Sequence, residues 1–405
     1  MNFDQLKRLT GLGSGRQSTD KQPAPSKVGK VLVLDGTNVV GHRVVDRLVK
    51  GGYASNLRVG MRDATEKLPW EGVEAAKFVW ENEESYSEAL KGMKTVFVTI
   101  PSGNKNWDKH FPAFLTACHD AKIKRIVKLS FFHAMQSRAE DPKHYFGDPD
   151  YKYSHDDFHK VPLVHRHALC DGDLILKGLD CTILFASHLM SNVLAYQGKT
   201  LDQENRFYGA SKGKGVNYVS PNDVAEIAYL AILHPKAYKR EGISLLGPSP
   251  INDSDVAKLL TSCLGTKITY EEKPLDYFDE DSAGLESIKA SGLEEDEKFP
   301  KGDFKRIVGR EPESFEAYLA AKDCMSPLEL KVFPQEVNAP DEENKENVHE
   351  LTKEKQVEEN KEEAAKEMIE DSPVQEYEVA KSEGEVETKI GDATIATEEV
   401  HVASQ

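Results

Sequence analysis

Residues 35–41 could bind phosphate, because glycines there follow a short apolar segment and precede a helical pattern. Backbone N–H groups in such a turn point toward an anion, and the positive end of the following helix favours negative charge. In the G-x-x-G-x-x-G spacing counted back from Gly41, Asp35 and Asn38 stand where glycines are expected. Gly36 is one position away from the first of them. The turn therefore keeps part of a phosphate-binding motif.

The two replacements change the chemistry of this turn. Asn38 tolerates the left-handed backbone conformation better than most residues do. The Asp35 carboxylate would repel an anionic ligand unless it turns away or caps the helix. Gly41 still permits close packing of the helix. The residues expected to contact a bound dinucleotide here are Asp35, Gly36, Thr37, Asn38, Val40 and Gly41.

A basic residue stands where NAD-binding proteins carry an acidic one. About 20 residues after the turn, an acidic side chain would bind the ribose hydroxyls of NAD, and the sequence has Met61 and Arg62 there. A guanidinium suits the 2′-phosphate of NADP, and Arg58 and Lys67 could assist it. We therefore expect NADP rather than NAD; the alternative is an ordinary exposed arginine.

The elements that must position these residues alternate between short apolar segments and amphipathic segments. Strands are predicted at 31–34, 57–61, 95–100, 126–129, 181–184 and 244–246, and helices at 39–50, 111–121, 168–177, 222–233, 252–263 and 314–321. Strands that are apolar on both faces and separated by helices indicate a parallel sheet covered on two sides. The sequence thus predicts a doubly wound α/β domain of the Rossmann type.

A long segment rich in His, Asp and Tyr interrupts this alternation at 133–160. We expect it to form a loop over the carboxyl end of the sheet, where ligands bind. His155 and His159 are four residues apart, with His144, His165 and His167 nearby, which raises the alternative of a zinc site. A third ligand at helical spacing is missing, so no metal is predicted and the loop is interpreted as a substrate or partner surface.

Several later segments together resemble the NmrA-like proteins, which are atypical relatives of the short-chain dehydrogenases. The matching segments are 77–92, 96–101, 124–130, 178–184, 219–228, 246–248 and 308–316, so the resemblance runs from about residue 30 to residue 323. It implies a Rossmann domain that binds NADP or NAD, with a smaller C-terminal α/β lobe closing over a cleft. Some members reduce small organic substrates and others sense the nicotinamide pool. The resemblance places Pro101 and Ser130 beside the nicotinamide.

The sequence departs from this family at positions that matter for catalysis. Phe185 and Ala186 replace a common Arg-Pro pair, and Asp171 stands where a Glu is common. Ordinary short-chain dehydrogenases need a Tyr and a Lys four residues apart on a helix. Tyr208 and Lys212 have this spacing, but they follow the wrong strand and are interpreted as a chance match in a loop. The proton donor is not identified; the only candidates are His133 and Tyr145.

The acidic residues are concentrated at the end of the chain. Between Glu336 and Gln405 there are 22 Asp and Glu, seven Lys and no Arg, so this segment carries most of the formal net charge of −17. It has little apolar surface to bury, and residues 335–405 are therefore expected to be a disordered acidic tail. Residues 1–29 are expected to be a disordered leader, which leaves one folded unit at 30–325.

Composition also limits the compartment and the partners. The five cysteines are scattered, as is typical of a reducing compartment. The sequence has no apolar run of about 18 residues and no signal-peptide core. It predicts a cytoplasmic protein, with a nuclear location left open, and no membrane contact. Lys122, Lys124, Arg125 and Lys128 form a basic cluster too local to predict nucleic-acid binding.

Two functions remain open from the sequence. The first is an NADP(H)-binding oxidoreductase or nicotinamide-pool sensor that acts on a small organic substrate. The second is a catalytically inactive binding module, with a protein partner bound through the acidic tail or the 133–160 loop.

Overall fold

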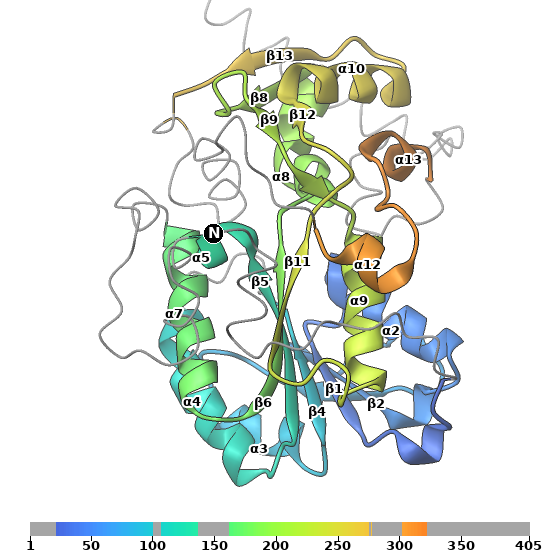
Figure 1. Cartoon of the computed structure of the whole chain (residues 1–405), viewed down its shortest axis with the longest axis vertical. Helices are drawn as coiled ribbons and strands as arrows, with labels where there is room; N and C mark the ends of the chain where they lie inside the picture. The colour runs from blue at the N-terminus through green and yellow to red at the C-terminus, as the bar shows by residue number, and fades with distance from the viewer. Residues whose placement is uncertain (1–21, 100–106, 137–161, 275–276, 278–301, 322–405) are drawn as a thin grey trace, which may run out of the picture. The chain divides into compact units, whose positions relative to one another are not determined.

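Seven parallel strands form the sheet that carries the predicted turn (Figure 1). The computed structural model describes residues 22–99, 107–136, 162–274, 277 and 302–321. The strands are β1 (Val31–Leu34), β2 (Leu57–Met61), β3 (Glu74–Lys77), β4 (Thr95–Val98), β5 (Arg125–Phe131), β6 (Asp180–Ala186) and β11 (Glu241–Leu245). Their order is β11-β6-β5-β4-β1-β2-β3, so the direction of winding reverses between β1 and β4. Ligands bind at such a reversal in sheets of this type.

Helices cover both faces of the sheet (Figure 1). On one face lie α2 (Val39–Lys50) and α9 (Pro221–Leu233), and on the other α3 (Glu84–Leu90), α4 (Trp107–Asp120) and α7 (Pro162–Leu176). Along β1, Val31 and Val33 point into the first core, whereas Leu32 and Leu34 point into the second. A strand buried on both sides needs apolar side chains throughout. The predicted doubly wound α/β fold is confirmed.

A smaller lobe with its own apolar core follows the sixth strand of the sheet. Its elements are β7 (His188–Leu189), α8 (Met190–Gln203), β8 (Arg206–Gly209), β9 (Gly215–Val216), β10 (Tyr218–Val219), β12 (Ile251–Asn252), α10 (Asp253–Leu264), β13 (Thr269–Glu272) and α13 (Phe315–Ala320). The short strands pair as β7 with β10, β9 with β12, and β8 with β13. The remaining short helices are η1 (Pro25–Lys27), η2 (Ala54–Asn56), α5 (Phe132–Gln136) and α12 (Phe304–Val308).

The sequence prediction missed the helices α3 and α8 and the edge strand β3. The β3 residues Glu-Ala-Ala-Lys include no apolar run, because an edge strand pairs on one side only and here stays partly exposed. The last strand, β11, begins at Glu241 rather than 244, and α7 begins at Pro162 rather than 168. Proline suits the first position of a helix, where its missing N–H costs nothing. β4 ends at Val98, and residue 100 lies outside the described residues.

The described chain begins before the predicted domain boundary at residue 30. The Tyr53 hydroxyl donates to the Pro23 carbonyl oxygen at 2.7 Å, and the Asn56 side-chain amide donates to the Val28 carbonyl oxygen at 2.7 Å. These bonds attach residues 22–29 to the segment before β2. The predicted tail, 335–405, lies outside the described residues.

None of the helices in the described part of the chain combines the length and the apolar character needed to cross a lipid bilayer.

Candidate functional site

The turn between β1 and α2 lies at the carboxyl end of β1 and contains one strained residue. Asp35, at the position of the first expected glycine, has a φ of 49°, and its N–H donates to the Gly60 carbonyl oxygen at 3.0 Å. The residue predicted to tolerate this conformation, Asn38, instead has a φ of −77° and caps α2. The left-handed residue of the turn is therefore Asp35, because the sharp bend comes directly after the strand.

Asn38 holds the start of α2 in place with both ends of its amide. Its Oδ1 accepts from the Gly41 N–H at 2.7 Å, and its Nδ2 donates to the Thr99 hydroxyl at 2.8 Å. That hydroxyl in turn donates to the Leu34 carbonyl oxygen at 3.1 Å. The cap thus connects α2 with the ends of β1 and β4, on the two sides of the reversal in strand order.

Four N–H groups of the turn are left for a ligand. Among the described residues, no acceptor binds the backbone N–H groups of Gly36, Thr37, Val39 or Val40. The first N–H groups of a helix have no partner within it, and the helix dipole adds positive potential there. Thr37 is exposed and Val40 is buried. The turn therefore offers the donors that a phosphate requires.

The two glycines of the turn are needed for packing. A Cβ on Gly41 would lie 2.4 Å from the Asp35 carbonyl oxygen, and one on Gly36 would lie 2.8 Å from Cγ1 of Val59. Both distances are far below van der Waals contact. Only glycine at these positions lets the turn lie this close to α2 and β2.

The Asp35 carboxyl is buried enough to change its ionisation. Burial raises its pKa to about 6, the nearby Arg62 opposes this rise, and Glu81 adds to it. Its Oδ2 has no hydrogen-bond partner among the described residues. A bound anion would raise the pKa further and favour the neutral form, which can donate a hydrogen bond. The repulsion expected from a carboxylate at this position is thereby reduced.

Arg62 follows β2 directly, and its side chain is 71% exposed. Its Nη2 lies 3.2 Å from Oε2 of Glu81. Arg58, named as a possible helper, is buried. It is bonded to Glu74 at 2.7 Å and to the backbone carbonyl oxygens of Ala89 and Lys91 at the end of α3. The expectation for Arg58 is wrong because this side chain joins β2 to β3 and α3. Lys67 is exposed.

At the carboxyl-terminal half of β5, a buried charged cluster joins this strand to α7. Lys128 Nζ lies 2.7 Å from Asp171 Oδ1, with both side chains fully buried. Ser130 donates to Asp171 Oδ2 at 2.5 Å, and its Oγ lies 3.3 Å from Nδ1 of His167. Burial and the Lys128 charge hold the pKa of His167 well below its ordinary value. The hydroxyl predicted to lie beside a nicotinamide is thus bonded to Asp171.

The sequence interpretation missed this cluster, because it placed Lys128 and Arg125 in a surface basic group. Arg125 is buried as well and lies 3.0 Å from Asp180. The signal that could have revealed both is their position in one strand whose other residues, apart from Ser130, are apolar. Two of the four cations of the basic group are therefore unavailable to a nucleic acid.

Two further histidines lie beside Phe131 at the carboxyl end of the sheet. The Phe131 ring centroid is 5.1 Å from that of His133 and 5.2 Å from that of His188, and all three side chains are buried. His188 follows β6, and sequence reasoning did not select it. Pro101 and Tyr145, which it did select, lie outside the described residues.

The Tyr-Lys spacing does not lie on a helix. Tyr208 lies in β8 of the lobe and donates to Glu204 Oε2 at 2.6 Å, while Lys212 follows in a turn with a φ of 56°. This supports the interpretation as a chance match. For the zinc alternative, no group of three or more metal-ligating residues occurs among the described residues, and His144, His155 and His159 lie outside them.

Comparison with known proteins gives the same picture as the geometry. A family model described as NAD(P)H-binding matches residues 36–235. The chain is similar to prestalk A differentiation protein A of Dictyostelium discoideum, with 26% identity over 73% of this chain and 92% of that protein. It is also similar to an uncharacterized oxidoreductase of Bacillus subtilis, with 24% identity over 73% of this chain and 96% of that protein.

Solved structures share the fold at low identity. An NADPH-dependent quinone oxidoreductase from Escherichia coli, complexed with NADPH, aligns with a TM-score of 0.56 at 19% identity, over 72% of this chain and 98% of that chain. Triphenylmethane reductase from Citrobacter sp., complexed with NADP(H), aligns with a TM-score of 0.56 at 16% identity, over 72% of this chain and 99% of that chain.

Proposed function

We propose, on the premise that residues 36–235 form an NAD(P)-binding domain, that the protein is an NADP(H)-dependent reductase of the NmrA-like, atypical short-chain dehydrogenase type. The observation that carries the proposal is the set of four unpaired N–H groups at the start of α2, next to the reversal in strand order. These donors suit the pyrophosphate of a dinucleotide. The NADP(H) complexes of two proteins with the same fold support the choice of cofactor.

Arg62 is the residue proposed to select NADP(H) over NAD(H). Its exposed pair with Glu81 is worth about 0–1 kcal/mol, whereas a charge-assisted bond to a phosphate is worth about 1.5–3 kcal/mol. The guanidinium would therefore leave Glu81 for the 2′-phosphate. Burial raises the pKa of Asp35, the other anion near this group, to about 6, so a bound phosphate can favour its neutral form.

Residues of this chain would position the cofactor and the substrate for the reaction. A bound nicotinamide would supply the hydride for the reduction of a small organic substrate. Asn38 and Thr99 fix the turn that holds the cofactor, and the Lys128–Asp171 pair fixes Ser130 at the end of β5. Fixed positions of this kind convert binding energy into correct orientation of the reactants.

A second candidate function is a binding or regulatory module without turnover. It is favoured by the Ser130 hydroxyl, which is bonded to Asp171 instead of facing a ligand, and by the Tyr208–Lys212 spacing, which does not lie on a helix. Binding of NADPH without any turnover would support this candidate.

Calorimetric titration of the full-length chain with NADPH and NADH tests the proposal. We expect NADPH to bind at least tenfold more tightly than NADH. Arg62→Ala should weaken the affinity for NADPH about 10- to 100-fold, as expected for the loss of a charge-assisted bond. It should leave the affinity for NADH unchanged.

The matched control is Arg206→Ala, because Arg206 also forms an exposed pair with a glutamate, Glu271, but in the lobe. It should leave both affinities unchanged. Equal loss of NADPH and NADH binding in Arg62→Ala would refute the role of Arg62, and binding of neither cofactor would refute the proposed function.

A further inference from the structure

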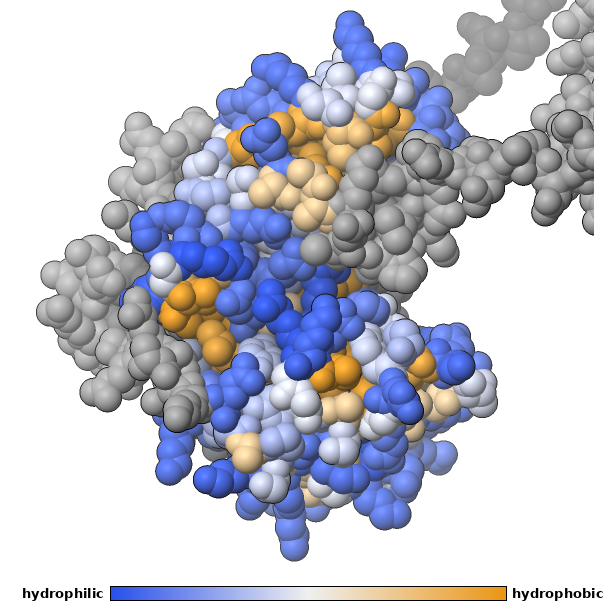
Figure 2. Space-filling view, turned by 90° about the vertical axis from the view of Figure 1, so that its right-hand side faces the viewer, coloured by the Kyte–Doolittle hydropathy of each residue, from blue (hydrophilic) through white to orange (hydrophobic). Residues whose placement is uncertain are grey.

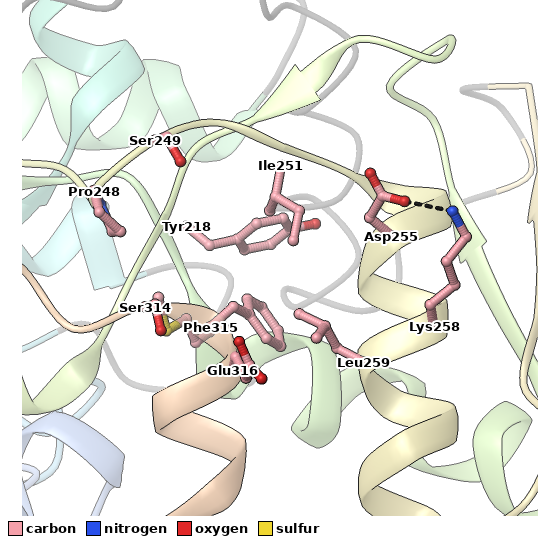
Figure 3. A pocket seen from close by; sticks show the side chains of 11 residues that line it. Tyr218, Pro248, Ser249, Ile251, Asp255, Lys258, Leu259, Ser314, Phe315 and Glu316 are labelled. Carbon is pink, nitrogen blue, oxygen red and sulfur yellow. Dashed lines mark hydrogen bonds and ion pairs between the residues drawn. The ribbon is translucent and has the colours of Figure 1, made fainter.

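A cavity of about 390 Å³ lies in the C-terminal lobe, between the segment after β11 and the helices α10 and α13 (Figure 3). Its volume lies within the usual range of small-molecule sites, about 300–1,000 Å³. None of its lining residues belongs to the turn at 35–41 or to the Lys128 cluster. Figure 2 faces this side of the molecule and shows apolar surface gathered on the lobe, next to hydrophilic surface.

The floor of the cavity is apolar and well fixed. It is formed by Met190, Tyr218, Ile251, Leu259 and Phe315. The rings of Tyr218 and Phe315 meet edge to face at 5.3 Å. The Tyr218 hydroxyl donates to Asp253 Oδ1 at 3.0 Å, which fixes the ring and satisfies its polar end. The site is therefore preformed.

The segment after β11, which contributes lining residues to the cavity, crosses β10 closely. A Cβ on Gly247 would lie 1.9 Å from the Tyr218 carbonyl oxygen, so only glycine fits at this crossing. Pro248 and Ser249 follow and line the cavity, as Figure 3 shows.

The mouth of the cavity carries one uncompensated negative charge. Asp255 and Lys258 form an ion pair at 2.6 Å and neutralise each other (Figure 3). Glu316 lies on the other side, exposed in the first turn of α13, and no described residue pairs with it. A ligand that carries a positive charge next to an apolar group would complement this arrangement.

We propose that this cavity binds a small amphipathic organic cation. The apolar part lies against Tyr218 and Phe315, and the charged nitrogen lies near Glu316 at the mouth. Aromatic faces attract cations, and burial of the apolar part supplies most of the affinity. This site is separate from the phosphate-binding turn, so the proposal does not depend on the proposed reductase function.

Two small probes that differ in the sign of their charge test the proposal. The full-length chain is titrated with benzyltrimethylammonium and with phenylmethanesulfonate, and binding is followed by ligand-observed NMR. The cation is expected to bind at least fivefold more tightly than the anion, with or without NADPH. Equal affinities, or no binding of either probe at millimolar concentration, would overturn the proposal.

Two variants locate the binding in the cavity. Glu316→Gln should weaken binding of the cation about three- to fivefold and should not weaken binding of the anion, because the variant removes a negative charge. Glu71→Gln, at an exposed glutamate far from Glu316 in the sequence, should change neither affinity. Leu259→Trp should fill the cavity and abolish binding of both probes. If Glu316→Gln binds the cation as tightly as the wild-type chain does, the charge assigned to the mouth is wrong.

Discussion

At the scale of single residues, the turn after β1 shows how chemistry and backbone geometry can favour different residues. Asp35 occupies a left-handed position that glycine would fill without strain, and its carboxyl is buried without a described partner for Oδ2. Such a residue lowers the stability of the folded chain. Strained, poorly paired residues of this kind are concentrated at binding sites.

The buried Asp35 carboxyl predicts a specific pH dependence of stability. Its pKa rises from 3.8 to about 6 on folding, chiefly through burial. Below pH 3.8 the carboxyl is protonated in the folded and the unfolded chain, so its ionisation does not lower the stability of the fold. As the pH rises toward 6 the loss of stability grows, and above pH 6 it is complete. Asp35→Asn should therefore raise the free energy of unfolding at pH 7.5 by about 1–2 kcal/mol, and by much less at pH 4.

Urea denaturation of both chains at the two pH values measures this difference. Asp63→Asn is the control, because Asp63 is exposed and bonds with Thr65 hold its pKa below the ordinary value. That variant should not gain stability at pH 7.5. A gain of equal size at pH 4 and pH 7.5 in Asp35→Asn would show that relief of backbone strain, not ionisation, is responsible.

At the scale of elements, the apolar pattern was sufficient to predict the central strands and the helix after β1. It failed for β3, because an edge strand with one neighbour does not need an apolar run. The sequence pattern also did not predict the backbone conformations of Asp35 and Asn38, because the position of the bend depends on how closely Gly41 packs on the turn. Capping by Asn38 follows from its residue type, but its bond to Thr99 depends on the tertiary fold.

No sequence pattern pairs Lys128 with Asp171, since 43 positions separate them and only the packing of α7 on β5 brings them together. Removal of one member of a buried ion pair leaves the other without compensation. Lys128→Met should therefore lower the free energy of unfolding by about 3 kcal/mol. The double variant Lys128→Met, Asp171→Asn should recover part of this loss.

Chemical denaturation of the two single variants and the double variant measures the coupling. Lys124→Met, at an exposed lysine just before the same strand, should change the free energy of unfolding by less than about 0.5 kcal/mol. Losses that simply add in the double variant would contradict the pairing of Lys128 with Asp171.

At the scale of the folded unit, the sheet and the lobe are joined by contacts at the carboxyl ends of β5 and β6. The His188 ring lies 5.2 Å from that of Phe131 and 6.0 Å from that of Tyr218. The segment after α12 returns to the sheet side, where Arg310 lies 2.8 Å from the buried Asp223 of α9. The order of the elements is readable from the sequence, but these contacts are not, because each joins residues far apart in the chain.

Binding of a dinucleotide by this protein depends on the unpaired N–H groups of the turn, which would donate to its phosphate. The most direct measurement is a backbone-amide NMR titration of the full-length, isotope-labelled chain with NADPH. We predict that the N–H resonances of Thr37, Val39 and Val40 shift in a saturable way, while that of Gly41, already bonded to Asn38, moves less. Unchanged resonances of all four residues at saturating NADPH would contradict this role of the turn.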